Sequence, residues 1–216
     1  MDMNDASADK TNEDGGGNSR EFIANYPEKP IAELGTRLDD ETVFSKRRAE
    51  VYVLVRRGFD DTDIAEKLGI AESTVVEHRR QLSRLVEQSR ATVALAAATP
   101  DHEATAESEE EHDGEGETDF EGPPLDPSQW TAEEIAERTV LSERQAAVYV
   151  LNREYESKVR AGDRPDKNAV KTIAEELDLS RWTVYDHRDS IDDRMARAQN
   201  TLDLIALDDI SFPLTG

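Results

Sequence analysis

The chain of 216 residues contains no cysteine, so neither a disulfide framework nor a thiolate metal site can be built from it. It also lacks any run of about 18 apolar residues, and no segment is therefore predicted to span a membrane. The first 20 residues are acidic and polar, unlike a signal or transit peptide. Lysine is scarce, with 7 lysines against 19 arginines. These absences predict a cytoplasmic protein.

Charge is strongly acidic but unevenly distributed. The net charge is -23, from 49 acidic and 26 basic residues. Residues 99–140 carry a net -14, whereas residues 44–98 carry +2 and residues 141–200 carry -1. An acidic, lysine-poor composition indicates a protein from a salt-loving organism, and ordinary acidic disordered tails are the alternative. Self-repulsion destabilises a compact state unless salt screens it, and at about 1 M salt the screening length is roughly 3 Å.

Composition also predicts disorder in several segments. Residues 1–20 lack aromatic and apolar β-branched side chains and include three consecutive glycines, which is typical of a disordered tail. Residues 99–126 are predicted to form an acidic linker. Residues 21–43 form an N-terminal extension and residues 208–216 a C-terminal tail.

Two similar segments lie on either side of the linker. "SKRRAEVYVL" (45–54) matches "SERQAAVYVL" (142–151) at an offset of 97. "IAEKLGIAESTVVEHRRQL" (64–82) matches "IAEELDLSRWTVYDHRDSI" (173–191) at an offset of 109. The chain therefore contains an internal repeat, and the second copy carries 12 additional residues. The region of the insertion, residues 153–171, is rich in lysine and arginine and is predicted to form a basic loop.

The apolar spacing predicts three helices in each copy, and hence an all-α protein with two small domains at 44–98 and 127–207. The second helix of the first copy is expected to stop at Gly69. A capping-box pattern at Thr131 and Glu134 predicts one more short helix ahead of the second copy. No glycine or proline interrupts residues 72–98 or 181–206, so each third helix is expected to continue as a long tail. The tail can pair with another subunit in a homodimer or fold back on its own core.

A short helix, a glycine turn and a further helix describe a helix-turn-helix unit. The stretch "FSKRRAEVYVLVRRGFDDTDIAEKLGIAESTVVEHRRQLSRLV" resembles the DNA-binding domain of the LuxR family. It is similar also to the fourth region of bacterial sigma factors and to sigma-like helix-turn-helix proteins of haloarchaea. The matching residues are Ser45, Arg47, Gly58, Ile64 to Ile70, Thr74, Val75 and His78. The resemblance implies binding to double-stranded DNA, with the third helix in the major groove.

Helical geometry assigns candidate DNA contacts in the first copy. Val75 and Leu82 define the buried side of the third helix, at about 100° per residue. The opposite side then carries Ser73, Val76, Glu77, Arg80, Gln81 and Arg84. Arginine can bond to guanine, glutamine to adenine and glutamate to cytosine. Thr74, His78 and Arg79 lie beside this surface, and His78, Arg79 and Arg47 are expected to face phosphates.

The same geometry gives the second copy a different surface. Its outward residues are Trp182, Tyr185, Asp186, Asp189, Ser190 and Asp193. Carboxylates there would face the negative potential of DNA, whereas exposed aromatic residues favour a protein interface. Candidates for auxiliary contacts with DNA or a partner are Arg164, Lys167, Arg181, Trp182, Tyr185, His187 and Arg188.

The expected function is sequence-specific DNA binding in transcription regulation. The first domain would read the major groove, and the second would be a diverged copy for auxiliary DNA contact, dimerisation or partner recruitment. The alternative is an adaptor that binds the transcription machinery without specific DNA binding. No nucleophile–base arrangement, phosphate-binding glycine loop or metal-ligand spacing is present, so neither an enzyme nor a cofactor or metal is expected.

Overall fold

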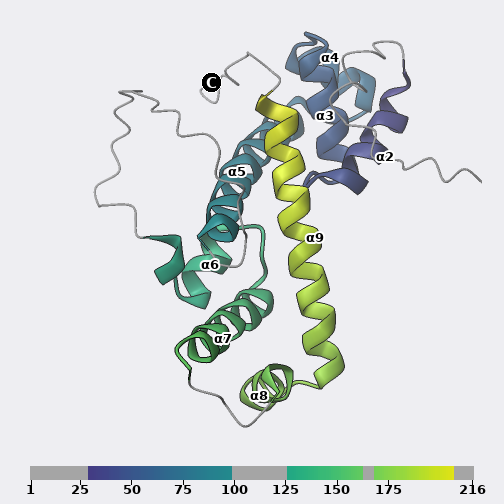
Figure 1. Cartoon of the computed structure of the whole chain (residues 1–216). Coiled ribbons are helices and arrows are strands. Elements are labelled where there is room, and N and C mark those ends of the chain that lie inside the picture. The colour runs from purple at the N-terminus through teal and green to yellow at the C-terminus, as the bar shows by residue number, and fades with distance from the viewer. Residues whose placement is uncertain (1–28, 99–125, 163–167, 207–216) are drawn as a thin grey trace, which may run out of the picture.

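The computed structural model describes residues 29–98, 126–162 and 168–206, and all its regular elements are helical, which confirms the all-α prediction (Figure 1). The helices are α2 (Ile31–Glu41), α3 (Lys46–Arg56), α4 (Asp61–Leu68), α5 (Glu72–Ala97), the 3-10 helix η1 (Pro127–Gln129), α6 (Ala132–Arg138), α7 (Glu143–Arg160), α8 (Ala169–Glu176) and α9 (Arg181–Ala206). Both predicted tails and residues 99–125 of the predicted linker lie outside the described residues. No described helix is long and apolar enough to cross a membrane.

The turn between α4 and α5 follows from local chemistry. Asp60 caps the start of α4 by accepting a hydrogen bond from the backbone N of Asp63 at 2.8 Å. Gly69 ends the helix with φ of 63°, a left-handed conformation that glycine adopts without a steric penalty. Asp178 stands at the equivalent position of the second copy with φ of 52°, and aspartate is among the few other residues that tolerate this region.

Each copy has a further helix ahead of the three that the sequence predicts. In the first copy this is α2, in the predicted N-terminal extension, and in the second it is α6, the short helix that the pattern at Thr131 and Glu134 predicts. The corner after this helix is the same in both copies. Thr42 Oγ1 donates to the carbonyl of Leu38 and accepts from the backbone N of Phe44. Thr139 Oγ1 makes the two equivalent bonds, to the carbonyl of Ile135 and from the backbone N of Leu141. The sequence contains a sign of this shared corner, because Thr42 and Val43 recur as Thr139 and Val140 at the offset of 97.

The predicted capping box at Thr131 is present, and Ser142 forms a second one with Gln145. Ser45 occupies the N-cap of α3, but its side chain makes no capping hydrogen bond. Much of the predicted basic loop is helix instead, since α7 continues to Arg160 and α8 begins at Ala169. No glycine or proline interrupts α7 before Gly162, where φ is 86°.

The two copies exchange the ends of their long helices. The first core cluster contains Val75 and Leu82 of α5, but also Leu204 from the end of α9. The second contains Val184 and Ile191 of α9, together with Leu95 from the end of α5. The helices α5 and α9 therefore run side by side in opposite directions (Figure 1). Each tail packs on the other copy of the same chain and not on its own core, so that part of the prediction is wrong.

Two equivalent hydrogen bonds fix this exchange, and we call these junctions the clasps. In the first, Thr201 Oγ1 of α9 accepts from the backbone N of Val43 at 3.2 Å. In the second, Thr92 Oγ1 of α5 accepts from the backbone N of Val140 at 3.1 Å. Both threonines are fully buried. The helix surface predicted to carry a homodimer is thus occupied, in the described residues, by the other copy.

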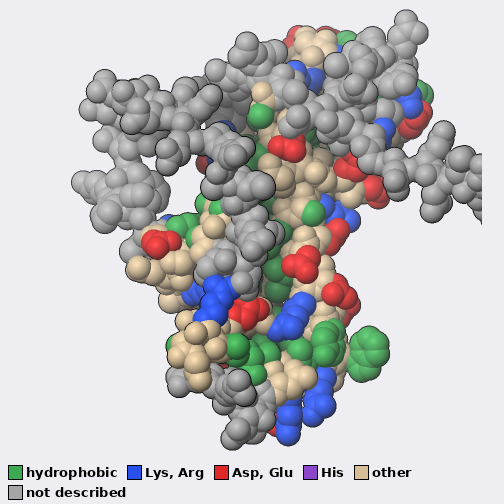
Figure 2. Space-filling model, viewed as in Figure 1, with side chains coloured by type: hydrophobic (Ala, Val, Ile, Leu, Met, Phe, Trp, Pro, Cys, Tyr) green, Lys and Arg blue, Asp and Glu red, His purple; other side chains and the backbone are tan. Residues whose placement is uncertain are grey.

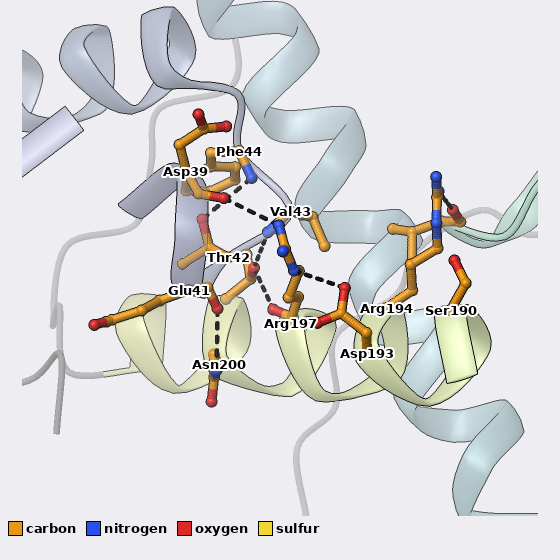
Figure 3. A network of polar contacts seen from close by, with 12 residues as sticks. Asp39, Glu41, Thr42, Val43, Phe44, Ser190, Asp193, Arg194, Arg197 and Asn200 are labelled. Atoms are coloured by element: carbon orange, nitrogen blue, oxygen red, sulfur yellow. Dashed lines mark hydrogen bonds and ion pairs between the residues drawn. The ribbon is translucent and has the colours of Figure 1, made fainter. Parts of the chain in front are cut away.

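The first clasp also satisfies the end of α2. Arg197 Nη1 donates to the carbonyl of Asp39 at 3.1 Å, and Asn200 Nδ2 donates to the carbonyl of Glu41 at 3.0 Å (Figure 3). The last carbonyls of a helix have no partner within the helix. Two side chains of the second copy therefore provide hydrogen-bond donors for the last carbonyls of α2 in the first copy.

Candidate nucleic-acid interface

The N-terminal half of α5 presents one polar surface to solvent. Val75 and Leu82 are buried in the core beneath it. The reading face on the opposite side consists of Ser73, Val76, Glu77, Arg80, Gln81 and Arg84, and all of these except the half-buried Gln81 are exposed. The Arg80 side chain is 84% exposed, and its guanidinium lies 4.0 Å from the Glu77 carboxylate. Thr74, beside this face, is half-buried.

Gln81 is held by the protein itself. Arg48 Nε of α3 donates to Gln81 Oε1 at 2.8 Å. Gln81 Nε2 in turn donates to Glu77 Oε1 at 2.8 Å. Both ends of the amide are engaged, which fixes the orientation of Gln81, although Oε1 keeps a second lone pair and Nε2 a second N–H. The sequence indicated the polar face of α5, but it did not indicate the hydrogen bonds that join Arg48, Gln81 and Glu77.

In the structure, two arginines that were expected at phosphates connect helices. Arg79 Nη1 of α5 pairs with Asp61 Oδ1 at the start of α4, at 2.8 Å. Arg47 Nη2 of α3 donates to the carbonyl of Leu68, the last residue of α4, at 2.9 Å, and its Nη1 pairs with Glu50. These contacts hold α4 at both ends, which fixes its position against α3 and α5. The two arginines therefore position the reading face.

His78 lies half-buried beside these arginines. Its Nδ1 is buried and has no hydrogen-bond partner among the described residues. Burial lowers the pKa of His78 below its usual 6.5, and the positive charges of Arg48 and Arg47 lower it further, while Glu77 acts in the opposite direction. The imidazole is consequently neutral near pH 7 and adds no positive charge toward phosphates.

A lowered pKa predicts a specific dependence of stability on pH. As the pH falls below about 6.5, unfolded chains take up a proton on His78 before folded chains do, so the free energy of unfolding decreases until the folded pKa is passed. Replacing His78 with glutamine should remove this component. Urea unfolding at pH 7.5, 6.5 and 5.5 measures it, and an unchanged pH dependence in His78→Gln would contradict the assignment.

The equivalent face of α9 is acidic and aromatic. Trp182 is 83% exposed and Tyr185 is 47% exposed, with the exposed Asp186 and Asp189 on the same helix. Figure 2 shows acidic side chains along α9 and hydrophobic ones gathered near its lower end. Asp193, by contrast, pairs with Arg197 of the first clasp at 2.9 Å. We call Trp182, Tyr185, Asp186 and Asp189 the acidic–aromatic face.

The described residues among the remaining candidates of the second copy differ in exposure. Arg181 is exposed, whereas His187 and Arg188 are half-buried. The Nε of Arg188 is buried and has no hydrogen-bond partner among the described residues. Ser190, predicted to face outward, is half-buried and accepts a hydrogen bond from Gln145 Nε2 at 2.7 Å. Arg164 and Lys167 lie outside the described residues.

Comparison with protein-family models, curated proteins and solved structures finds no match to this chain. The resemblance to LuxR-type and sigma region-four units therefore rests on the motif residues alone.

Proposed function

We propose that the protein is a sequence-specific DNA-binding regulator of transcription, and that each copy is a helix-turn-helix unit of the LuxR or sigma region-four type. The observation that supports this most is the reading face of α5. It presents two exposed arginines, Arg80 and Arg84, on the helix that follows the turn at Gly69. The pairs of Arg47 and Arg79 keep α4 fixed against this helix. An α-helix with such side chains fits the major groove.

The spacing of the two copies permits docking at two successive grooves, but the difference in charge between them supports a single point of docking. The N-terminal halves of α5 and α9 lie at opposite ends of an antiparallel pair of 26-residue helices, and each helix is about 39 Å long at 1.5 Å per residue. That length is comparable with the roughly 34 Å between successive major grooves. The acidic–aromatic face lacks the cations of the reading face, so we propose that only the first copy reads bases.

The test of this proposal is a selection of duplexes from a random pool, followed by measurement of affinity against salt. Lys46 at the start of α3 and Arg80 and Arg84 on α5 are exposed cations. If these three neutralise phosphates, log Kobs should fall with log salt with a slope of about -3. Fluorescence anisotropy of a labelled selected duplex, in potassium chloride from 0.1 to about 1 M, measures the slope.

The outcomes separate the proposal from its rivals. No enrichment of any duplex at any salt would overturn specific DNA binding. A slope steeper than about -6 would mean that further cations contact the backbone, and the reading face would then not be the main source of affinity.

The exposure of Trp182 favours a second function, an adaptor that binds a protein of the transcription machinery. Large aromatic side chains are enriched at protein interfaces. The carboxylates of Asp186 and Asp189 lie on the same face as Trp182 and favour a partner surface with basic residues. We propose this face as the recruitment surface of the regulator. Failure to enrich any duplex would leave it as the main function of the chain.

A further inference from the structure

A cavity of about 590 Å³ lies between the two copies. Its walls come from the corner between α2 and α3, the corner between α6 and α7, and the sides of α5 and α9. Part of this wall is visible in Figure 3, where Arg197 of α9 lies beside Val43, and Arg194 and Ser190 stand farther along the same helix. The volume lies within the range of pockets that hold small organic ligands. The cavity exists only because the two copies exchange their helix ends.

The lining is suited to an anion. Arg48, Arg194 and Arg197 line it, against the carboxylates of Asp39 and Asp193. The Asp193 carboxylate is already compensated by Arg197 at 2.9 Å. Arg48 donates through Nε to Gln81, and Arg194 through Nη1 to the carbonyl of Val140, so each guanidinium retains further N–H groups for a ligand.

Two helix starts add to the positive character. Ser45 and Ser142, the N-caps of α3 and α7, both line the cavity. The N-terminus of a helix carries the equivalent of about half a positive charge. The side chain of Ser45 makes no capping hydrogen bond, so its hydroxyl is available as a donor to a ligand. Arginines and helix starts from both copies thus converge on one space.

We propose that this cavity binds a small phosphate-bearing molecule and that the ligand controls the reading face. Arginine suits phosphate because its planar N–H groups match the phosphate oxygens. The apolar residues of the lining, among them Leu85 and Leu141, cover the rest of the ligand. The regulatory part of the inference rests on the proposed function.

Arg48 connects the cavity to the reading face. It holds Gln81 at 2.8 Å, and Gln81 holds Glu77 at 2.8 Å. A phosphate bound to the remaining N–H groups of Arg48 pulls the guanidinium into the cavity and withdraws its Nε from Gln81. Once released, the amide of Gln81 and the carboxylate of Glu77 can reorient toward bases. The ligand therefore alters DNA binding without touching DNA.

Binding is tested without DNA, by calorimetric titration of the full chain with inorganic phosphate at constant ionic strength set by potassium chloride. We expect saturable binding of one phosphate, weakened about tenfold or more in Arg194→Gln and in Arg48→Gln because each variant loses a charge-assisted contact. Arg90→Gln is the matched control, since Arg90 lies on α5, pairs with Glu87 and does not line the cavity. Absence of saturable binding, or equal binding by wild type and Arg194→Gln, would overturn the site.

The coupling is tested on the selected duplex, with and without phosphate at the same ionic strength. We expect phosphate to change the affinity of the wild type and to have no effect on Arg48→Gln, which has no guanidinium to withdraw from Gln81. Phosphate binding without any change in DNA affinity would overturn the coupling. Because the titration uses no DNA, failure of the proposed function and failure of the site give different results.

Discussion

Replacing Leu204 with alanine should destabilise the first copy, although Leu204 stands at the end of the last helix of the second. The side chain is 3% exposed and belongs to the core cluster that contains Val51 and Leu54 of α3. Removing a buried leucine side chain costs about 2–5 kcal/mol. Amide hydrogen exchange in residues 51–54 should therefore accelerate by at least about 25-fold, since tenfold corresponds to about 1.4 kcal/mol.

The matched control is Leu202→Ala, because Leu202 is half-buried on the same helix and belongs to neither core cluster. Leu95→Ala is the mirror experiment and should accelerate exchange in the second copy, where Leu95 packs with Val148. If Leu204→Ala left exchange in α3 unchanged, the helix ends would not be exchanged between the copies. Two separate urea transitions in the wild type would contradict the exchange as well.

Replacing Arg80 or Arg84 with alanine should weaken binding to the selected duplex by about 5- to 140-fold, which corresponds to about 1–3 kcal/mol, if the residue makes a bidentate contact to guanine. Both side chains are exposed, so the fold should be unaffected. Sequence preference at the contacted base pair should relax at the same time. A second selection with each variant measures both quantities.

Arg90→Ala is the control for this experiment, because Arg90 is exposed farther along α5 and pairs with Glu87 at 2.6 Å. A uniform loss of affinity over all sequences would reassign Arg80 or Arg84 to a phosphate contact. Unchanged affinity in both variants would remove the reading face from the proposal. Arg79→Ala, by contrast, should act mainly on stability, since Arg79 pairs with Asp61.

The roles of the arginines show where inference from sequence stops. Helical periodicity separated the buried side of α5, with Val75 and Leu82, from the exposed side with Arg80 and Arg84. The same reasoning directed Arg47 and Arg79 to phosphates. Their partners, the carbonyl of Leu68 and the carboxylate of Asp61, lie on a different helix. Periodicity along one helix carries no information about charges on its neighbours.

The sequence by itself determined the three helices shared by the two copies, the stop at Gly69, the internal repeat and the divergence of the second face to Trp182 and Asp189. These are local properties, set by capping, apolar spacing and side-chain charge. The tertiary structure decided what covers the ends of the long helices. The apolar residues around Leu95 and Leu204 show that another surface must cover them. Any apolar surface of matching shape would meet that need, so the sequence alone does not identify the surface. Only the packed chain shows that each copy provides that surface for the other, and that a cavity forms between them.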